Sequence, residues 1–159
     1  MVQWPAVGAV CSVVGPAGRF DTASGTRGLH ANAPAKANSV ARIASVTKGM
    51  VATVAMQEVE RSTLSLDSTL GEVLPGLWPE HEDKVTLSML LNHTSGMPDA
   101  IGVIMRGQSL FDLDLDELAE VVSRHYGQRE LVELAEQAGW WFEPGTDYRY
   151  SNTGYVVVE

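Results

Sequence analysis

The stretch Ser45-Val46-Thr47-Lys48 places a hydroxyl and an amine three residues apart, at the point where the hydrophobic pattern takes on a helical period. Residues i and i+3 lie on one face of a helix, so the Lys48 amine can reach the Ser45 oxygen. Backbone N–H groups in a first helical turn lack helical partners and favour nearby negative charge. The pattern suits a serine that is acylated with help from a lysine. Taken alone, the pattern is more commonly that of a helix-capping serine beside a solvated lysine.

The residues after this stretch carry the pattern of an amphipathic helix. Apolar side chains recur about once per helical turn, at Val46, Met50, Val54 and Val59. The spacing predicts a helix of about 16 residues with one apolar face. Ser45 would then lie at the start of this helix, where the unpaired N–H groups are.

The chain before this helix has the composition of a strand pair. The segment from Val7 to Val14 is rich in small and β-branched residues, which predicts a buried strand. The turn signal Gly15-Pro16-Ala17-Gly18 follows, so we expect residues 19–26 to return as the second strand of a hairpin. Cys11 lies in the middle of the first strand, and we expect it to be a small buried hydrophobic residue.

Further helices are expected downstream. Thr86 is a suitable N-cap for a short helix over residues 87–92. Asp116 is expected to cap a second helix. The side chains expected to face inward from that helix are Leu118, Val121 and Val122.

Tyr150-Ser151-Asn152 is the second stretch that can carry chemistry. A phenol can transfer a proton, and an asparagine amide can hold a substrate carbonyl or position a lysine. The alternative is structural: a buried tyrosine beside an asparagine that caps a helix beginning at Thr153. Taken alone, the structural interpretation is the more common one.

Together these residues resemble the serine hydrolase family that contains class C β-lactamases, D-alanyl-D-alanine carboxypeptidases and related esterases. Flanking segments are similar to the family's habitual sequence. They are Ala41-Arg42-Ile43-Ala44, Leu64-Ser65-Leu66-Asp67, Leu74-Pro75-Gly76, residues 90–98 (LLNHTSGMP) and Pro144-Gly145. The resemblance runs from the first strand to Glu159. It implies an α+β fold of the β-lactamase/transpeptidase type, with N-terminal strands in residues 1–44 and a mainly helical part in residues 45–159.

The resemblance also implies roles for four residues. Ser45 matches the nucleophile, Lys48 the residue that activates it, Tyr150 the proton-relay tyrosine, and Asn152 the polar residue that faces the lysine and the substrate. The Ser45 backbone N–H would be one arm of the oxyanion hole. The implied substrate is a small molecule or peptide with an ester, amide or β-lactam carbonyl, and no metal or organic cofactor is implied.

The chain departs from the family pattern in one main respect. The third motif, Lys-Thr-Gly or His-x-Gly on a strand beside the nucleophile, is absent from the sequence. In the family this strand closes the site and supplies the second oxyanion donor. We therefore expect an incomplete domain, truncated before the returning strands and inactive on its own. The rival hypothesis is a non-catalytic, penicillin-recognising relic or gene fragment, which a genuine stop codon after residue 159 would favour.

The amino-acid composition argues against several classes of binding partner. The 159 residues carry 11 Lys and Arg against 20 Asp and Glu, a net charge of −9, which argues against nucleic-acid and anionic-membrane surfaces. The single cysteine excludes an internal disulfide. No apolar run approaches the ~20 residues of a membrane span. No basic leader is visible, so we expect a cytoplasmic protein, or a periplasmic or secreted one if the true start lies upstream. The oligomeric state stays open.

Other signals favour structural roles. His93 is expected to be a loop-bonding residue rather than a catalytic one, and Trp140-Trp141-Phe142 is expected to pack in the core rather than to line a substrate cleft. The pattern Asp112-x-Asp114-x-Asp116 imitates a calcium loop but lacks its glycine and closing glutamate, so we expect a solvated helix entry. The remaining histidines, His30, His81 and His125, do not have metal-ligand spacing.

Overall fold

The computed structural model describes residues 7–28, 31–105, 107 and 114–159. The chain divides into two compact units, Met1–Ile43 and Ala44–Glu159, which are described separately below. Asp112, the first residue of the pattern that imitates a calcium loop, lies outside the described residues.

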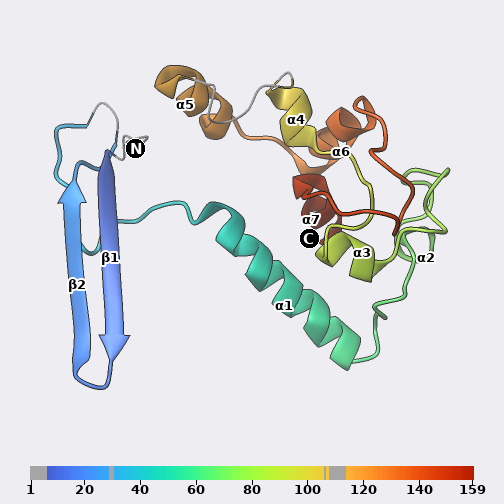
Figure 1. Cartoon of the computed structure of the whole chain (residues 1–159), viewed down its shortest axis with the longest axis horizontal. Coiled ribbons are helices and arrows are strands. Elements are labelled where there is room, and N and C mark those ends of the chain that lie inside the picture. Colours follow the sequence, from blue (N-terminus) through green and yellow to red (C-terminus); the bar gives the residue numbers. More distant parts are fainter. Residues whose placement is uncertain (1–6, 29–30, 106, 108–113) are drawn as a thin grey trace. The chain divides into compact units, whose positions relative to one another are not determined.

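The first unit contains the predicted hairpin. Strand β1 (Gly8–Gly15) pairs antiparallel with β2 (Gly18–Gly25), in a register that runs from Gly8 opposite Gly25 to Gly15 opposite Gly18 (Figure 1). Pro16 and Ala17 form the connection. Gly18 has a φ of +118°, a conformation that only glycine adopts readily, so the turn depends on the missing side chain.

The expectation that the first strand is buried is wrong. Every residue of β1 is exposed, and Val14 of β1 and Phe20 of β2 expose 74% and 64% of their surface. Cys11 is exposed as well, not buried. The physical reason is that β1 and β2 form a sheet of two strands, and in the described part of this unit no second layer packs on either face.

The second unit begins with the helix that the sequence predicts. A single 3₁₀ turn, η1 (Ala44–Val46), leads into α1 (Thr47–Glu60), a helix of 14 residues. The expected apolar face is only partly covered, because Ala55 is buried whereas Met50 and Val54 are each 58% exposed. Helix α1 ends at Glu60, and Ser62, two residues later, has a left-handed φ of +60°.

Six shorter helices follow in the described residues. They are α2 (Leu70–Val73), α3 (Leu87–Leu91), α4 (Ala100–Ile104), α5 (Leu115–Ser123), α6 (Gln128–Glu136) and α7 (Asn152–Val158). Thr86 caps α3 as predicted, accepting a hydrogen bond from the Met89 N–H. Helices α2 and α4 are not anticipated by the sequence analysis, because one turn is too short to display a helical period.

Two N-caps differ from the expected residues. Asp114, not Asp116, caps α5, because its carboxylate accepts the N–H groups of Asp116 and Glu117. Ser151, not Asn152, caps α7 by accepting the Gly154 N–H. The Asn152 side chain is therefore free for other contacts. Of the three side chains expected to face inward from α5, Val121 is half-buried, and those of Leu118 and Val122 lie outside the described part.

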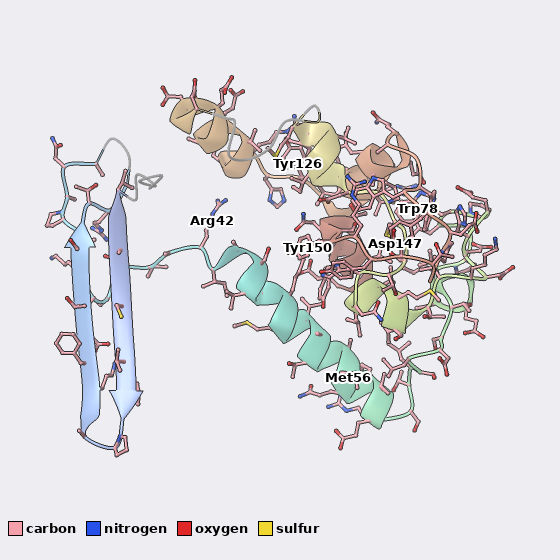
Figure 2. The ribbon with its side chains drawn as sticks, viewed as in Figure 1. Arg42, Met56, Trp78, Tyr126, Asp147 and Tyr150 are labelled. Carbon is pink, nitrogen blue, oxygen red and sulfur yellow. The ribbon has the colours of Figure 1, made fainter. Side chains whose placement is uncertain are left out.

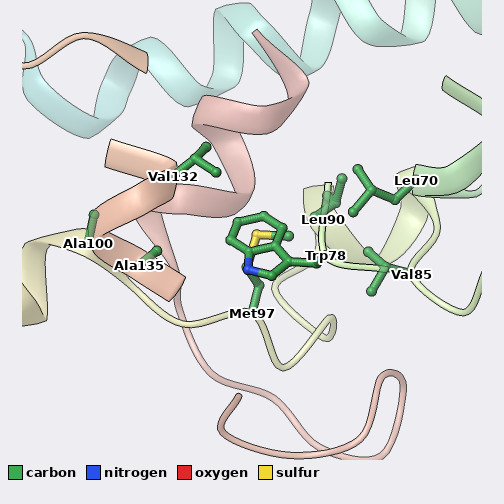
Figure 3. Close-up of a cluster of buried hydrophobic side chains, with 8 residues drawn as sticks. All are labelled: Leu70, Trp78, Val85, Leu90, Met97, Ala100, Val132 and Ala135. Carbon is green, nitrogen blue, oxygen red and sulfur yellow. The ribbon is translucent and has the colours of Figure 1, made fainter. Parts of the chain in front are cut away.

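Helix α7 lies among the other helices of this unit and contacts α1, α3, α4 and α6 (Figure 1). The buried cluster beside it consists of Leu70, Trp78, Val85, Leu90, Met97, Ala100, Val132 and Ala135 (Figure 3). The valines of α7 pack against this cluster, and Trp140 does so too, as predicted. The core therefore fixes the position of α7, whose first residue belongs to the site described next.

Candidate active site at the start of α1 and α7

The four residues singled out in the sequence come together in the second unit. Ser45 lies in η1, Lys48 in the first turn of α1, and Tyr150 and Asn152 at the start of α7. The Tyr150 hydroxyl donates a hydrogen bond of 2.9 Å to Ser45 Oγ. Lys48 Nζ donates to Ser45 Oγ at 3.4 Å and to Asn152 Oδ1 at 2.7 Å. Figure 2 shows the Tyr150 side chain between α1 and α7.

Ser45 stands on an unusual piece of backbone. The preceding residue, Ala44, has a φ of +45°, a region that costs a non-glycine residue about 1–2 kcal/mol. The chain turns sharply there, and the Ser45 side chain is exposed at the entry to α1. Sparsely populated conformations of this kind persist where the surrounding structure holds them, and they cluster at functional sites.

Lys48 is half-buried beside aromatic rings. Its Nζ lies 5.0 Å from the centroid of the Tyr150 ring and 5.6 Å from that of the Tyr155 ring. The Tyr155 hydroxyl is turned away and donates to the Leu91 carbonyl at 2.9 Å, which ties α7 to the end of α3. Among the described residues, Lys48 is thus held by two hydrogen-bond acceptors and two ring faces rather than by a carboxylate.

Asp99 is a member of the site that the sequence analysis missed. It caps α4, since Oδ1 accepts the Ile101 N–H at 3.3 Å. The same carboxylate accepts the Asn152 backbone N–H at 3.2 Å and the Asn152 side-chain amide at 2.9 Å. Its signal in the sequence, an aspartate just before a short apolar run, is that of an ordinary N-cap. Its link to Asn152 depends on contacts 53 positions apart.

His93 is a loop-bonding residue, as predicted, and the loop that it bonds is the segment before α7 rather than its own turn. Its Nδ1 accepts the Ser151 N–H at 3.3 Å, and its carbonyl accepts the Arg149 N–H at 3.0 Å. Its ring lies 4.4 Å from that of Tyr150, centroid to centroid. Burial and the positive charge of Lys48 lower the pKa of His93, while the negative charge of Asp99 opposes them. The neutral imidazole fits a nitrogen that accepts a hydrogen bond.

The turn that contains His93 also holds the segment leading to Tyr150. The Thr94 carbonyl accepts the Gly145 N–H at 2.9 Å, and the Gly96 carbonyl accepts the Trp141 N–H at 3.0 Å. Gly96 has a φ of +75°, and a Cβ there would collide with the Phe142 carbonyl oxygen. The close approach of the two segments requires glycine at this position.

Two features are absent from the described residues. These residues contain no group of three or more His, Cys, Asp or Glu side chains arranged to hold a metal ion. Within the same residues, no helix combines the length and the apolar character needed to cross a membrane.

Comparisons with known proteins agree with the resemblance. The model of the family described as Beta-lactamase matches residues 6–159. Esterase EstB of Burkholderia gladioli is 33% identical over 147 residues, and penicillin-binding protein 4* of Bacillus subtilis (strain 168) is 29% identical over 127 residues. A crystal structure of a D-stereospecific amidohydrolase from Streptomyces sp. superposes with a TM-score of 0.76 at 27% identity.

The coverage of these matches is uneven. The match covers 83% of this chain for the esterase, 79% for the penicillin-binding protein and 97% for the amidohydrolase. The chain spans only 34%, 25% and 43% of those proteins. The structural match confirms the predicted α+β fold of the β-lactamase/transpeptidase type for the part of the fold that this chain spans.

Proposed function

The chain belongs to the beta-lactamase family. From this premise we propose that it acts in a serine hydrolase and that Ser45 is the nucleophile. The single observation that carries the proposal is that Lys48 and Tyr150 both donate hydrogen bonds to Ser45 Oγ. A serine hydroxyl becomes an effective nucleophile when a neighbouring group removes its proton. We further propose that residues 1–159 belong to one domain, with strands before residue 45 and helices after it.

In the acylation step, Ser45 Oγ attacks the carbonyl carbon of the substrate. Its proton passes to Lys48 in the neutral amine form, 3.4 Å away. Tyr150 and Ser45 are within 2.9 Å, and rotation of two hydroxyl groups can exchange their donor and acceptor roles. Tyr150 can therefore pass a proton on to the leaving group as the carbonyl–heteroatom bond breaks.

Backbone N–H groups at the start of the helix stabilise the developing oxyanion. The Ser45 backbone N–H lies in the 3₁₀ turn before α1, where N–H groups lack helical acceptors and favour negative charge. Water then attacks the acyl carbon and gives a proton to Tyr150, the bond between that carbon and Ser45 Oγ breaks, and Lys48 returns its proton to Ser45 Oγ. No metal or organic cofactor takes part in these steps.

The proposed substrate is a small molecule or peptide with an ester, amide or β-lactam carbonyl. The relatives support this range, because they are named as an esterase, a penicillin-binding protein and a D-stereospecific amidohydrolase. Asn152 is proposed to hold the substrate while its carbonyl oxygen faces Lys48.

A second candidate is a penicillin-recognising protein without turnover. The observation that favours it is the similarity to penicillin-binding protein 4*, which is 29% identical over 127 residues. The two candidates predict different fates of an acyl group on Ser45: an enzyme releases it, whereas a recognition protein retains it or never forms it.

The test uses the full-length gene product that contains these residues. A fluorophosphonate probe should label Ser45, and Ser45→Ala should abolish the labelling, whereas the same change at the exposed Ser123 should not. Peptide mapping that finds the adduct on Ser95 or Ser151 would sink the assignment. Hydrolysis of a p-nitrophenyl ester or nitrocefin that depends on Ser45 supports the enzyme, and a stable adduct without turnover supports the recognition protein.

A further inference from the structure

We propose that Asp99 is a positioning residue, which fixes the end of the Asn152 amide that faces Lys48. The inference rests on the proposed function, because it assigns Asp99 to the same site. Asp99 belongs to none of the stretches from which the function is argued, and it lies 51 positions from Lys48 and 53 from Asn152 (99 − 48 and 152 − 99).

The geometry gives Asn152 two polar neighbours, one on each side of its amide. Its side-chain oxygen accepts from Lys48 Nζ at 2.7 Å, and its side-chain nitrogen donates to Asp99 Oδ2 at 2.9 Å. The Asn152 backbone N–H donates to the other oxygen of Asp99 at 3.2 Å. The carboxylate therefore holds both the main chain and the side chain of Asn152.

The chemistry of the partners permits only one orientation of the amide. An ionised carboxylate offers acceptors and no donor, so the Asn152 side-chain nitrogen must face Asp99, and the oxygen then faces the Lys48 amine, which has N–H donors in either protonation state. The amide must present its oxygen to Lys48 and its nitrogen to Asp99. Rotated by half a turn, it would place N–H groups against the lysine and its oxygen against the carboxylate. Asp99 thus excludes the amide orientation in which Lys48 would lose its acceptor.

The cap of α4 does not by itself require this arrangement. Capping uses Oδ1, which accepts the Ile101 N–H at 3.3 Å, and a serine performs the same task. The second oxygen of Asp99 serves Asn152 alone among the contacts of the described residues. An aspartate at this position therefore does more than start a helix of one turn.

The substitution Asp99→Ser separates the two tasks, because serine keeps the cap but is too short to reach the Asn152 amide. With the amide free to rotate, Lys48 loses its fixed acceptor. We expect the rate at which a p-nitrophenyl ester acylates Ser45 to fall roughly 10- to 100-fold, the cost of a misplaced catalytic group. Asp114→Ser is the matched control, because it makes the same change at the aspartate cap of α5 and should leave acylation unchanged.

A double-mutant cycle in the full-length gene product tests whether Asp99 acts through Asn152. If it does, Asp99→Ser should have no further effect in an Asn152→Ala background, whereas a general loss of structure would add to it. Wild-type acylation by Asp99→Ser, or additive losses in the double variant, would overturn the inference.

A second measurement decides the matter if Ser45 forms no adduct in the wild type, which would count against the proposed function and not against Asp99. By NMR, the Asn152 side-chain N–H that faces Asp99 should exchange slowly with solvent. Its protection should disappear in Asp99→Ser and persist in Asp114→Ser. Protection that survives Asp99→Ser, or that the wild type lacks, overturns the positioning role.

Discussion

The Tyr150 hydroxyl donates a hydrogen bond of 2.9 Å to Ser45 Oγ although 105 positions separate the two residues. Neither helix creates this contact alone. The Arg149 N–H donates to the His93 carbonyl, and the His93 ring lies 4.4 Å from the Tyr150 ring, so the loop after α3 holds the tyrosine in place. The position of Tyr150 therefore depends on the loop that contains His93.

Tyr150→Phe should keep the fold and slow turnover of a p-nitrophenyl ester by about 10² or more, the usual contribution of a general acid–base group. Tyr148→Phe is the matched control, because Tyr148 is 63% exposed and its ring contacts the edge of His93 without a hydrogen bond to Ser45. Equal rates for Tyr150→Phe and the wild type in single-turnover experiments would contradict the relay role.

Lys48→Arg should lose most acylation of Ser45, because arginine keeps its positive charge and cannot accept a proton. The measurement is the rate of labelling by a fluorophosphonate probe. Lys84→Arg serves as the control, since Lys84 pairs with Glu143 at 3.1 Å on the surface and should tolerate the change. Near-normal labelling of the Lys48 variant would rule out lysine as the base.

The lowered pKa of His93 predicts how stability depends on pH. Between that lowered value and the ordinary value of 6.5, the unfolded chain binds more protons at this residue than the folded chain. The free energy of unfolding should therefore fall as the pH drops through 6.5 toward the folded-state pKa, and this group should contribute no slope at higher pH.

Urea unfolding of the wild type and of His93→Asn on either side of pH 6.5 checks this prediction. Asparagine tolerates the left-handed conformation at residue 93 and offers an oxygen to the Ser151 N–H, but it does not titrate. The variant should show a weaker dependence on pH than the wild type. The same change at the exposed His125 is the control, and an identical pH slope in wild type and His93→Asn would refute the assignment.

Gly96→Ala should destabilise the fold more than Gly139→Ala. Both glycines have positive φ, at +75° and +70°, so each alanine pays about 1–2 kcal/mol for a left-handed conformation. At Gly139 the added Cβ meets open space, whereas at Gly96 it collides with the Phe142 carbonyl. Urea unfolding of both variants gives the comparison. Equal losses in the free energy of unfolding would show that the backbone of residues 141–145 moves aside without destabilising the fold.

The 159 residues expressed alone should bind an apolar dye, unfold with weak cooperativity and show no Ser45-dependent hydrolysis. An open groove of about 460 Å³ between α1 and the facing helices is lined mainly by apolar side chains, including Val54, Leu74 and Val157. Uncovered apolar surface of this kind promotes association. Val54→Ser should reduce dye binding. A sharp thermal transition together with Ser45-dependent turnover would contradict the expectation.

Much of the candidate site was predictable because its residues belong to local sequence patterns. Ser45 and Lys48 share a helix face at spacing i, i+3, and the Tyr150-Ser151-Asn152 stretch stands beside a helix start. The hairpin and the cap of α3 at Thr86 follow from turn and capping residues. These features depend on neighbours in the chain, which is why the residue pattern contains them.

Other features were not predictable from local patterns. The strand pattern of β1 suggested burial, but alternation and β-branching do not say whether a second layer covers the sheet. Ser151 replaced Asn152 as the cap of α7, because both residue types can cap and only the packing of α7 leaves Asn152 between Lys48 and Asp99.

The sequence by itself determined which residues are candidates for the chemistry, where α1, α3, α5 and α7 begin within one or two residues, and which family the chain resembles. Tertiary structure decided the rest: that Tyr150 reaches Ser45, that Asp99 meets Asn152, and that Cys11 and β1 are exposed. The physical reason is range. Helical periods and caps arise from interactions within a few residues, whereas a hydrogen bond across 105 positions exists only after the core has fixed α7 against α1.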